Sequence, residues 1–218
     1  MMKAAFYLDM PIDLSWEGLH DRTARHGLYW MNSGHPSLDR DAILEAWADT
    51  STITISDWGV KENIGRTLTE PEFRNDDRML DRDAVRNLLI ESSFTDDEGN
   101  PETRRAGQVA GVLLRFCNDM TEETPVLVNL PDDTFGACIV TGDWELDEDH
   151  PVTSEDPNHI YARRVSWLRH DRSIARFDRN ILPESLHNIP DLTNAQIGGE
   201  RVDDLVDIAQ VTDFLAAD

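Results

Sequence analysis

The sequence predicts a mixed α+β fold with a strand-rich core and a helical insertion. Strand-type segments cluster between Val126 and Leu168, where apolar runs alternate with turns and polar residues. Residues 61–120 instead carry apolar side chains at helical spacing. At 218 residues the chain is long enough to bury a sizeable core. We therefore expect a single domain over residues 1–200 with the insertion at about 61–120, followed by an acidic C-terminal helix over 201–218.

The first sixty residues mix strands and one helix. Ala4–Leu8 and Gly27–Met31 are short apolar runs with aromatic content, which is typical of strands. Ser37 is placed to cap a helix that continues to about Trp47. Thr52–Ser56 alternates β-branched and polar residues, so we expect another strand there.

Two helices are expected in the insertion. The first runs from Asp81 to about Glu91. The second begins at Asn100-Pro101-Glu102, because a capping residue followed by proline suits the first helical turn. Its apolar face is formed by Val109, Val112, Leu113 and Phe116.

The strand-rich core contains the most unusual segment. A hairpin with a turn at Pro131-Asp132-Asp133 and an acidic loop precede a returning strand that carries Arg163, Arg164 and Trp167. Arginines beside aromatic rings suit a planar, negatively charged partner such as a nucleotide. The alternative is that the arginines form a solvated face and the tryptophan packs in the core.

Composition indicates a salt-rich environment. The chain has 28 Asp, 15 Glu, 18 Arg and 2 Lys, and its formal net charge is -23. Self-repulsion at this charge weakens a folded state in dilute buffer, whereas molar salt shortens the Debye length to roughly 3 Å. We therefore expect a protein from a halophilic organism; the alternative is an ordinary acidic protein that prefers arginine.

The same charge limits the partners. Nucleic-acid-binding domains are usually basic, and phosphate attraction weakens steeply with salt, so a nucleic-acid binder of this composition depends on base stacking.

Cys117 and Cys138 lie in apolar surroundings, which predicts buried thiols in a reducing compartment. We see no signal segment and no apolar run approaching 18 residues, so we expect a cytoplasmic protein without a membrane partner.

A series of short motifs resembles a known family. In chain order they are Trp30-Met31-Asn32-Ser33-Gly34, Ser56-Asp57-Trp58-Gly59, Arg115-Phe116-Cys117-Asn118, Thr124–Val128, Gly136–Glu145 and Arg163–Leu168. This order resembles the N-terminal, non-nuclease region of Mrr-type restriction proteins, which is related to the EVE, YTH and ASCH modules of the PUA-like group. The resemblance covers roughly residues 28–197.

The resemblance implies a PUA-like, twisted β-barrel flanked by helices. Modules of this group bind nucleic acids, and several hold a modified base flipped into an aromatic pocket, which requires flat walls and a few polar groups for the base edge. The expected nucleic-acid-binding residues are Trp30, Trp58, Trp144 and Trp167 as walls, Asn32 and Asp143 at the base edge, and Arg163 and Arg164 at flanking phosphates. We expect Trp58 and Trp144 to face each other across the pocket; the alternative for each tryptophan is a core position.

Catalytic motifs are missing from the sequence. A nuclease of the Mrr type needs a lysine beside its acidic pair, but Lys3 and Lys61 lie in no such setting. We find no G-x-S-x-G elbow, no Walker A motif and no zinc-ligand spacing. The missing motifs predict a non-catalytic protein without cofactor or metal, and the resemblance implies a reader of a modified base, in DNA more readily than in RNA. It would act in DNA defence or restriction, with a separate nuclease or helicase as effector.

The alternative is a structural or assembly protein, viral or cellular, that reuses the barrel for protein contacts and lacks a concave aromatic pocket.

Overall fold

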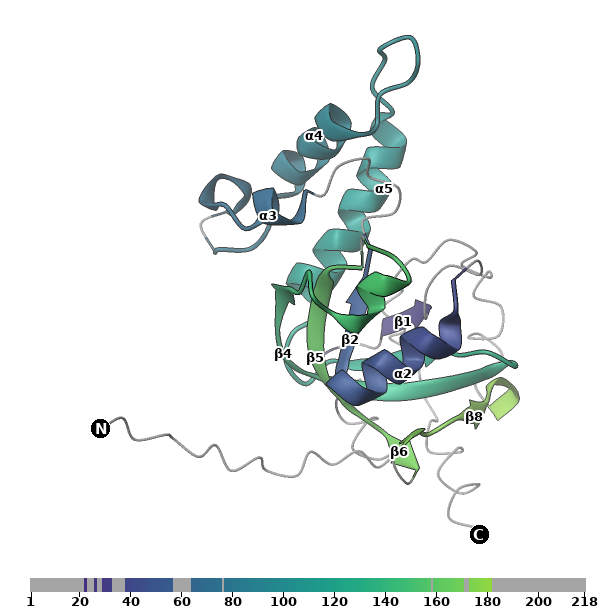
Figure 1. Ribbon diagram of the computed structural model, residues 1–218. Helices are drawn as coiled ribbons and strands as arrows, with labels where there is room; N and C mark the ends of the chain where they lie inside the picture. Colours follow the sequence, from purple (N-terminus) through teal and green to yellow (C-terminus); the bar gives the residue numbers. More distant parts are fainter. Residues whose placement is uncertain are drawn as a thin grey trace.

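A computed structural model describes most of the chain between Arg22 and Ile181. The described residues are 22, 26, 29–32, 38–56, 64–75, 77–157, 159–170 and 173–181. They form a mixed α+β structure in which a curled, half-barrel sheet is accompanied by four helices, so the predicted α+β class is confirmed (Figure 1). The strand predicted at Ala4–Leu8, the pocket residue Trp58 and the acidic C-terminal helix lie outside the described residues.

The main sheet contains the strands predicted at Gly27–Met31, at Thr52–Ser56 and between Val126 and Leu168. Its strands, in spatial order, are β1 (Tyr29–Asn32), β3 (Pro125–Asn129), β4 (Thr134–Leu146), β5 (Tyr161–Trp167) and β2 (Thr52–Ile55). β1 is parallel to β3, and the other pairs are antiparallel. β8 (Phe177–Asp178) pairs with the start of β4, whereas β6 (Arg169–His170) and β7 (Ser173–Ile174) form a separate ribbon.

Two local features shape β4. The turn that precedes it has both Asp132 and Asp133 in the left-handed region, at φ 60° and 55°, which matches the twist of a tight hairpin. The predicted hairpin turn is therefore confirmed. Further along, the register between β4 and β5 shifts between Val140 and Trp144. A bulge of this kind bends a strand and redirects the side chains that follow it.

Helix α2 (Arg40–Thr50) packs on the sheet through an apolar stripe. Its buried Trp47 stacks on Trp167 of β5, with ring centroids 6.3 Å apart. The predicted cap at Ser37 was wrong, because the carboxylate of Asp39 accepts the amide of Ala42 at 3.1 Å and so starts the helix two residues later.

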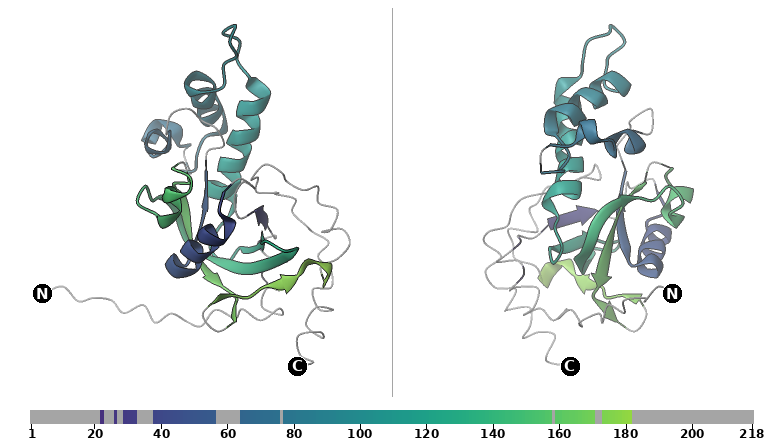
Figure 2. Two further views of the ribbon diagram at one scale, coloured as in Figure 1. Left: turned by 45° about the vertical axis from the view of Figure 1, so that its right-hand side comes forward. Right: turned by 90° about the vertical axis from the view of Figure 1, so that its left-hand side faces the viewer.

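The insertion projects from one end of the sheet (Figures 1 and 2). It consists of α3 (Gly65–Leu68), the 3-10 turn η1 (Pro71–Phe73), α4 (Arg82–Ser92), α5 (Thr103–Leu114) and the π-helical turn η2 (Arg115–Asp119). The predicted start of α4 is confirmed, since the Asp81 side chain accepts the amide of Ala84 at 2.8 Å.

The predicted start of α5 was wrong. Pro101 forms an isolated bridge with Thr95, and the Asp96 side chain accepts the amide of Asn100 at 2.7 Å. These contacts hold Asn100 in the preceding loop, so the helix begins at Thr103 without a side-chain cap. α5 has 12 residues, and among the described residues no helix is long and apolar enough to cross a membrane.

Both cysteines are buried and unpaired, as predicted. Burial raises the pKa of the Cys117 thiol to about 12 and also raises the pKa of Cys138. A thiol with a raised pKa remains protonated and is a poor nucleophile. Neither cysteine is therefore suited to covalent catalysis.

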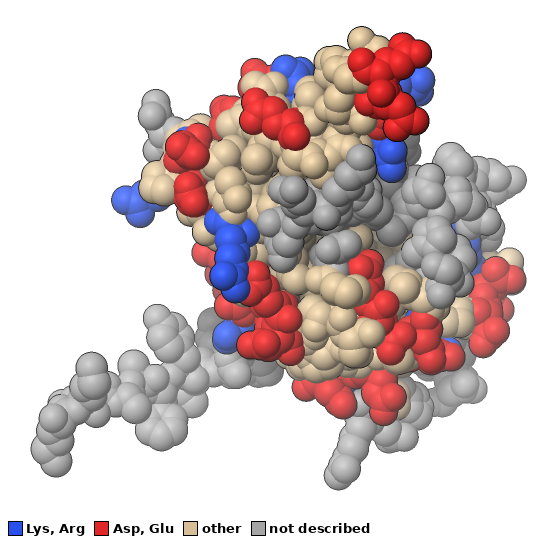
Figure 3. Space-filling view, turned by 45° about the horizontal axis from the view of Figure 1, so that its top comes forward, with Lys and Arg blue, Asp and Glu red and all other residues tan. Residues whose placement is uncertain are grey.

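Acidic side chains spread over the face of the molecule shown in Figure 3, with fewer basic side chains between them. We expect the free energy of unfolding to increase between 50 mM and 2 M KCl, because salt screens repulsion among these carboxylates. Urea denaturation followed by circular dichroism measures this effect. Equal stability at both salt concentrations would contradict the halophilic adaptation.

The loop between β4 and β5 is anchored by two buried histidines. His150 Nε2 lies 2.8 Å from Thr52 Oγ1, while His150 Nδ1 accepts the amide of Val152 at 3.2 Å. His159 Nδ1 lies 3.1 Å from Thr54 Oγ1. Both histidines thus fasten the loop to β2, and the His150 imidazole is neutral, because its Nδ1 atom accepts a hydrogen bond and carries no proton.

We expect this anchor to weaken in acid. Burial lowers the pKa of His159 to about 4, despite the opposing effect of Asp156, whereas an unfolded histidine titrates near 6.5. The unfolded state therefore binds more protons between these values, and stability falls as the pH drops from about 6.5 to about 4, by on the order of 2–3 kcal/mol. Denaturation curves for wild type and His159→Gln measure the difference. The variant should lose less stability over this range; parallel losses would exclude His159 as the cause.

Candidate functional site

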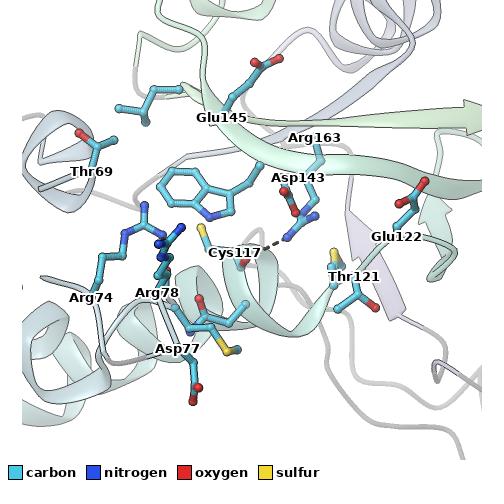
Figure 4. A pocket seen from close by; sticks show the side chains of 15 residues that line it. Thr69, Arg74, Asp77, Arg78, Cys117, Thr121, Glu122, Asp143, Glu145 and Arg163 are labelled. Carbon is cyan, nitrogen blue, oxygen red and sulfur yellow. Dashed lines mark hydrogen bonds between the residues drawn. The ribbon is translucent and has the colours of Figure 1, made fainter. Parts of the chain in front are cut away.

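A cleft of about 700 Å³ lies where the insertion meets the sheet. One wall is the part of β4 that follows the bulge, and the opposite wall is formed by Arg74, Asp77, Arg78 and Met79, between η1 and α4. The π-helical turn η2 contributes the floor through Cys117 and Asn118. In Figure 4 the Arg74 and Arg78 side chains rise together from one side of the cleft, and Asp143 lies on the other side next to Arg163.

Trp144 is the aromatic residue among the described residues that line this cleft. It is half-buried, and its ring lies 6.2 Å from that of Tyr161. The guanidinium carbon of Arg74 lies 4.9 Å from the centroid of the Trp144 ring, within the range of a cation–π contact. The bulge in β4 places Trp144 at this position, since the register with β5 resumes with the pair Trp144 and Arg163.

The segment Arg74–Leu80 is a tight turn that presents two arginines. The Asn75 side chain accepts the amides of Asp77 and Met79, both at 3.0 Å, and Arg78 adopts a positive φ of 63°. Arg74 also donates to the Arg78 carbonyl at 3.1 Å. The turn therefore places both arginines at the cleft, where the Arg78 carbonyl holds the Arg74 guanidinium group.

Arg163 is built into the protein rather than presented to solvent. Its side chain is 2 % exposed, and it donates to the carbonyls of Phe116, Cys117 and Gly142 at 2.7, 2.9 and 2.9 Å. Burial lowers the pKa of Arg163, while the neighbouring Cys117 and Asp143 oppose that shift. These bonds commit Arg163 to joining β5, β4 and η2, in place of the phosphate contact expected from the sequence.

The remaining predicted site residues are distributed over the molecule. Asp143 is exposed at the cleft, and the exposed Arg164 lies 3.7 Å from Glu145. Trp167 is buried against Trp47, which matches the alternative of a core position. The structure therefore brings Asp143, Trp144 and Arg163 together and keeps Trp167 out of the cleft.

Trp30 and Asn32 are also outside the cleft. They belong to β1, which is separated from β4 by β3. Trp30 is buried, with the Arg179 guanidinium 5.3 Å from its ring, and the Asn32 side-chain oxygen accepts from Asn129 at 3.0 Å. The facing pair Trp58 and Trp144 is not described, because Trp58 lies outside the described residues.

Sequence reasoning missed Arg74, Arg78 and Asn118 as parts of the site. Arg74 and Arg78 flank the polar run Asn75-Asp76-Asp77, which is a turn signal, but a turn signal does not indicate what the turn faces. Among the described residues, no group of three or more His, Cys, Asp or Glu side chains is arranged to hold a metal ion.

Comparisons of the chain with protein-family models, with curated proteins and with solved structures find no match.

Proposed function

We propose that the protein is a non-catalytic nucleic-acid recognition module whose cleft accepts one unstacked base on Trp144. The observation that carries the proposal is the half-buried Trp144 ring at a cleft of about 700 Å³, with a guanidinium group against it. Base stacking on an aromatic ring contributes roughly 1–3 kcal/mol and does not depend on long-range charge. It therefore suits a binder whose net charge is -23.

The groups around Trp144 match the other parts of a nucleotide. Arg74 and Arg78 place two guanidinium groups near the ring, where they would contact the phosphate beside the base. The exposed carboxylate of Asp143 at the cleft would accept hydrogen bonds from an amino group on the base edge. One cleft thus contains an aromatic ring for the base, guanidinium groups for the phosphate and a carboxylate for the edge of the base.

The proposal extends to the fold family, the ligand and the biological role. A curled sheet with a helical insertion is compatible with a PUA-like barrel, and the motif resemblance points to a reader of a modified base in DNA. Such a reader would serve defence or restriction in a halophilic organism, with a separate nuclease or helicase as effector.

Binding assays on labelled oligonucleotides test the proposal. Fluorescence anisotropy in 2 M KCl would compare single strands and duplexes that carry modified or unmodified bases. We expect saturable binding, tightest for a duplex with one modified base, and no strand cleavage in the presence of magnesium. Absence of binding to every probe would overturn the proposal, and cleavage would overturn the non-catalytic part of it.

A structural or assembly role is the second candidate. The cleft is lined by four carboxylates as well as arginines: Asp77, Glu122, Asp143 and Glu145. Such a lining suits a basic segment of a protein partner at least as well as a phosphate. Failure of all oligonucleotides together with salt-stable self-assembly in sedimentation experiments would favour this role.

A further inference from the structure

Both walls of the cleft are held by the same π-helical turn. A π turn inserts an extra residue into a helix and redirects its backbone groups, and such turns are frequent at functional sites. Here η2 directs the carbonyls of Phe116 and Cys117 toward Arg163. Arg163 in turn donates to Gly142, two residues before Trp144. The aromatic wall is thereby fixed to η2.

The opposite wall is fixed by Asn118. Its side-chain oxygen accepts the amide of Leu80 and its side-chain nitrogen donates to the carbonyl of Leu80, both at 3.0 Å. Leu80 is bridged in antiparallel fashion to Arg74, and Leu80 itself is buried. The two-point bond at Leu80 therefore sets the backbone from which the Arg74 side chain extends over Trp144.

We propose that Asn118 is a positioning residue for ligand binding: it holds Arg74 beside Trp144, so that the aromatic ring and the guanidinium group contact the same nucleotide. This inference rests on the proposed function for its ligand, but the positioning itself is a property of the free protein. It gives a physical role to the Arg115-Phe116-Cys117-Asn118 motif, which contributes no residue to the site predicted from the sequence.

A double-mutant cycle in ligand binding tests the inference. Asn118→Ala and Arg74→Ala should each weaken binding of a labelled oligonucleotide by about three- to tenfold, the range of a partly desolvated cation–π contact. The double variant should bind as Arg74→Ala does, because Asn118 acts through Arg74. Additive losses would overturn the inference.

A measurement on the free protein separates this inference from the proposed function. For wild type and for each variant, the emission of Trp144 is the difference between the spectra of that protein with and without the additional change Trp144→Phe. Quenching of this emission by acrylamide measures how exposed the Trp144 ring is. We expect Asn118→Ala and Arg74→Ala to increase this quenching. Asn129→Ala removes another side-chain bond of the sheet, at 3.0 Å to Asn32, and should leave the quenching unchanged.

The outcomes are distinct. Increased quenching without oligonucleotide binding by wild type would leave Asn118 as the positioning residue and overturn the proposed function. Unchanged quenching in folded Asn118→Ala would overturn the inference whatever the binding result. If Asn118→Ala does not fold, Asn118→Asp serves, since it keeps the acceptor for the Leu80 amide but sets a carboxylate oxygen against the Leu80 carbonyl, and quenching should again increase.

Discussion

Replacing Arg163 by methionine should lower the free energy of unfolding by roughly 3–5 kcal/mol. The guanidinium group donates to three backbone carbonyls, and each buried acceptor left without a donor costs about 1–3 kcal/mol. The same change releases β4 from η2, so the cleft should lose its shape as well. Urea denaturation in 2 M KCl measures the loss.

The neighbouring arginine provides a matched control. Arg164 lies on the same strand, but its side chain is 71 % exposed and meets Glu145 only at 3.7 Å. Arg164→Met should therefore change stability by less than about 0.5 kcal/mol. Similar losses for the two variants would show that Arg163 does not join the elements as described.

Trp144→Ala should weaken oligonucleotide binding by about ten- to a hundredfold, which corresponds to roughly 1–3 kcal/mol. At molar salt phosphate contacts contribute little, so loss of the stacking surface should remove most of the affinity. Trp144→Phe, which keeps a smaller ring, should lose less. Anisotropy titrations measure both, and far-ultraviolet circular dichroism establishes that the variants are folded.

An unchanged dissociation constant for folded Trp144→Ala would contradict the placement of a base on this ring. Arg164→Ala is the appropriate control, because its charge is near the cleft yet outside it. A loss for Arg164→Ala as large as that for Trp144→Ala would indicate charge-driven binding on the open surface of the sheet.

Local sequence signals predicted the described strands well and the starts of α2 and α5 poorly. The hairpin before β4 and helix α4 depend on neighbours in sequence, so turn preferences and apolar spacing identified them. The start of α5 depends on the Asp96 side chain and on a bridge from Thr95 to Pro101, which compete with the cap expected at Asn100. Competition between local alternatives is not visible in helix preferences alone.

The site was predicted in part for similar reasons. Arg163, Val165 and Trp167 share one face of β5 by the two-residue period of a strand, and all three are buried. This alternation was visible in the sequence and distinguishes Arg163 from Arg164. Arg74, in contrast, reaches the cleft through a bond between Leu80 and Asn118, 38 residues apart, and no local pattern encodes that contact.

Photo-cross-linking shows most directly whether a base stacks on Trp144, because it locates the base on the protein. A 5-iodouracil-substituted oligonucleotide that binds in 2 M KCl would be irradiated with the full-length protein, and the adduct mapped by mass spectrometry. If a base stacks on Trp144, an adduct should form on the peptide that contains Trp144 and should be lost in Trp144→Ala. Efficient cross-linking confined to other parts of the chain, with the Trp144 peptide unmodified, would contradict it.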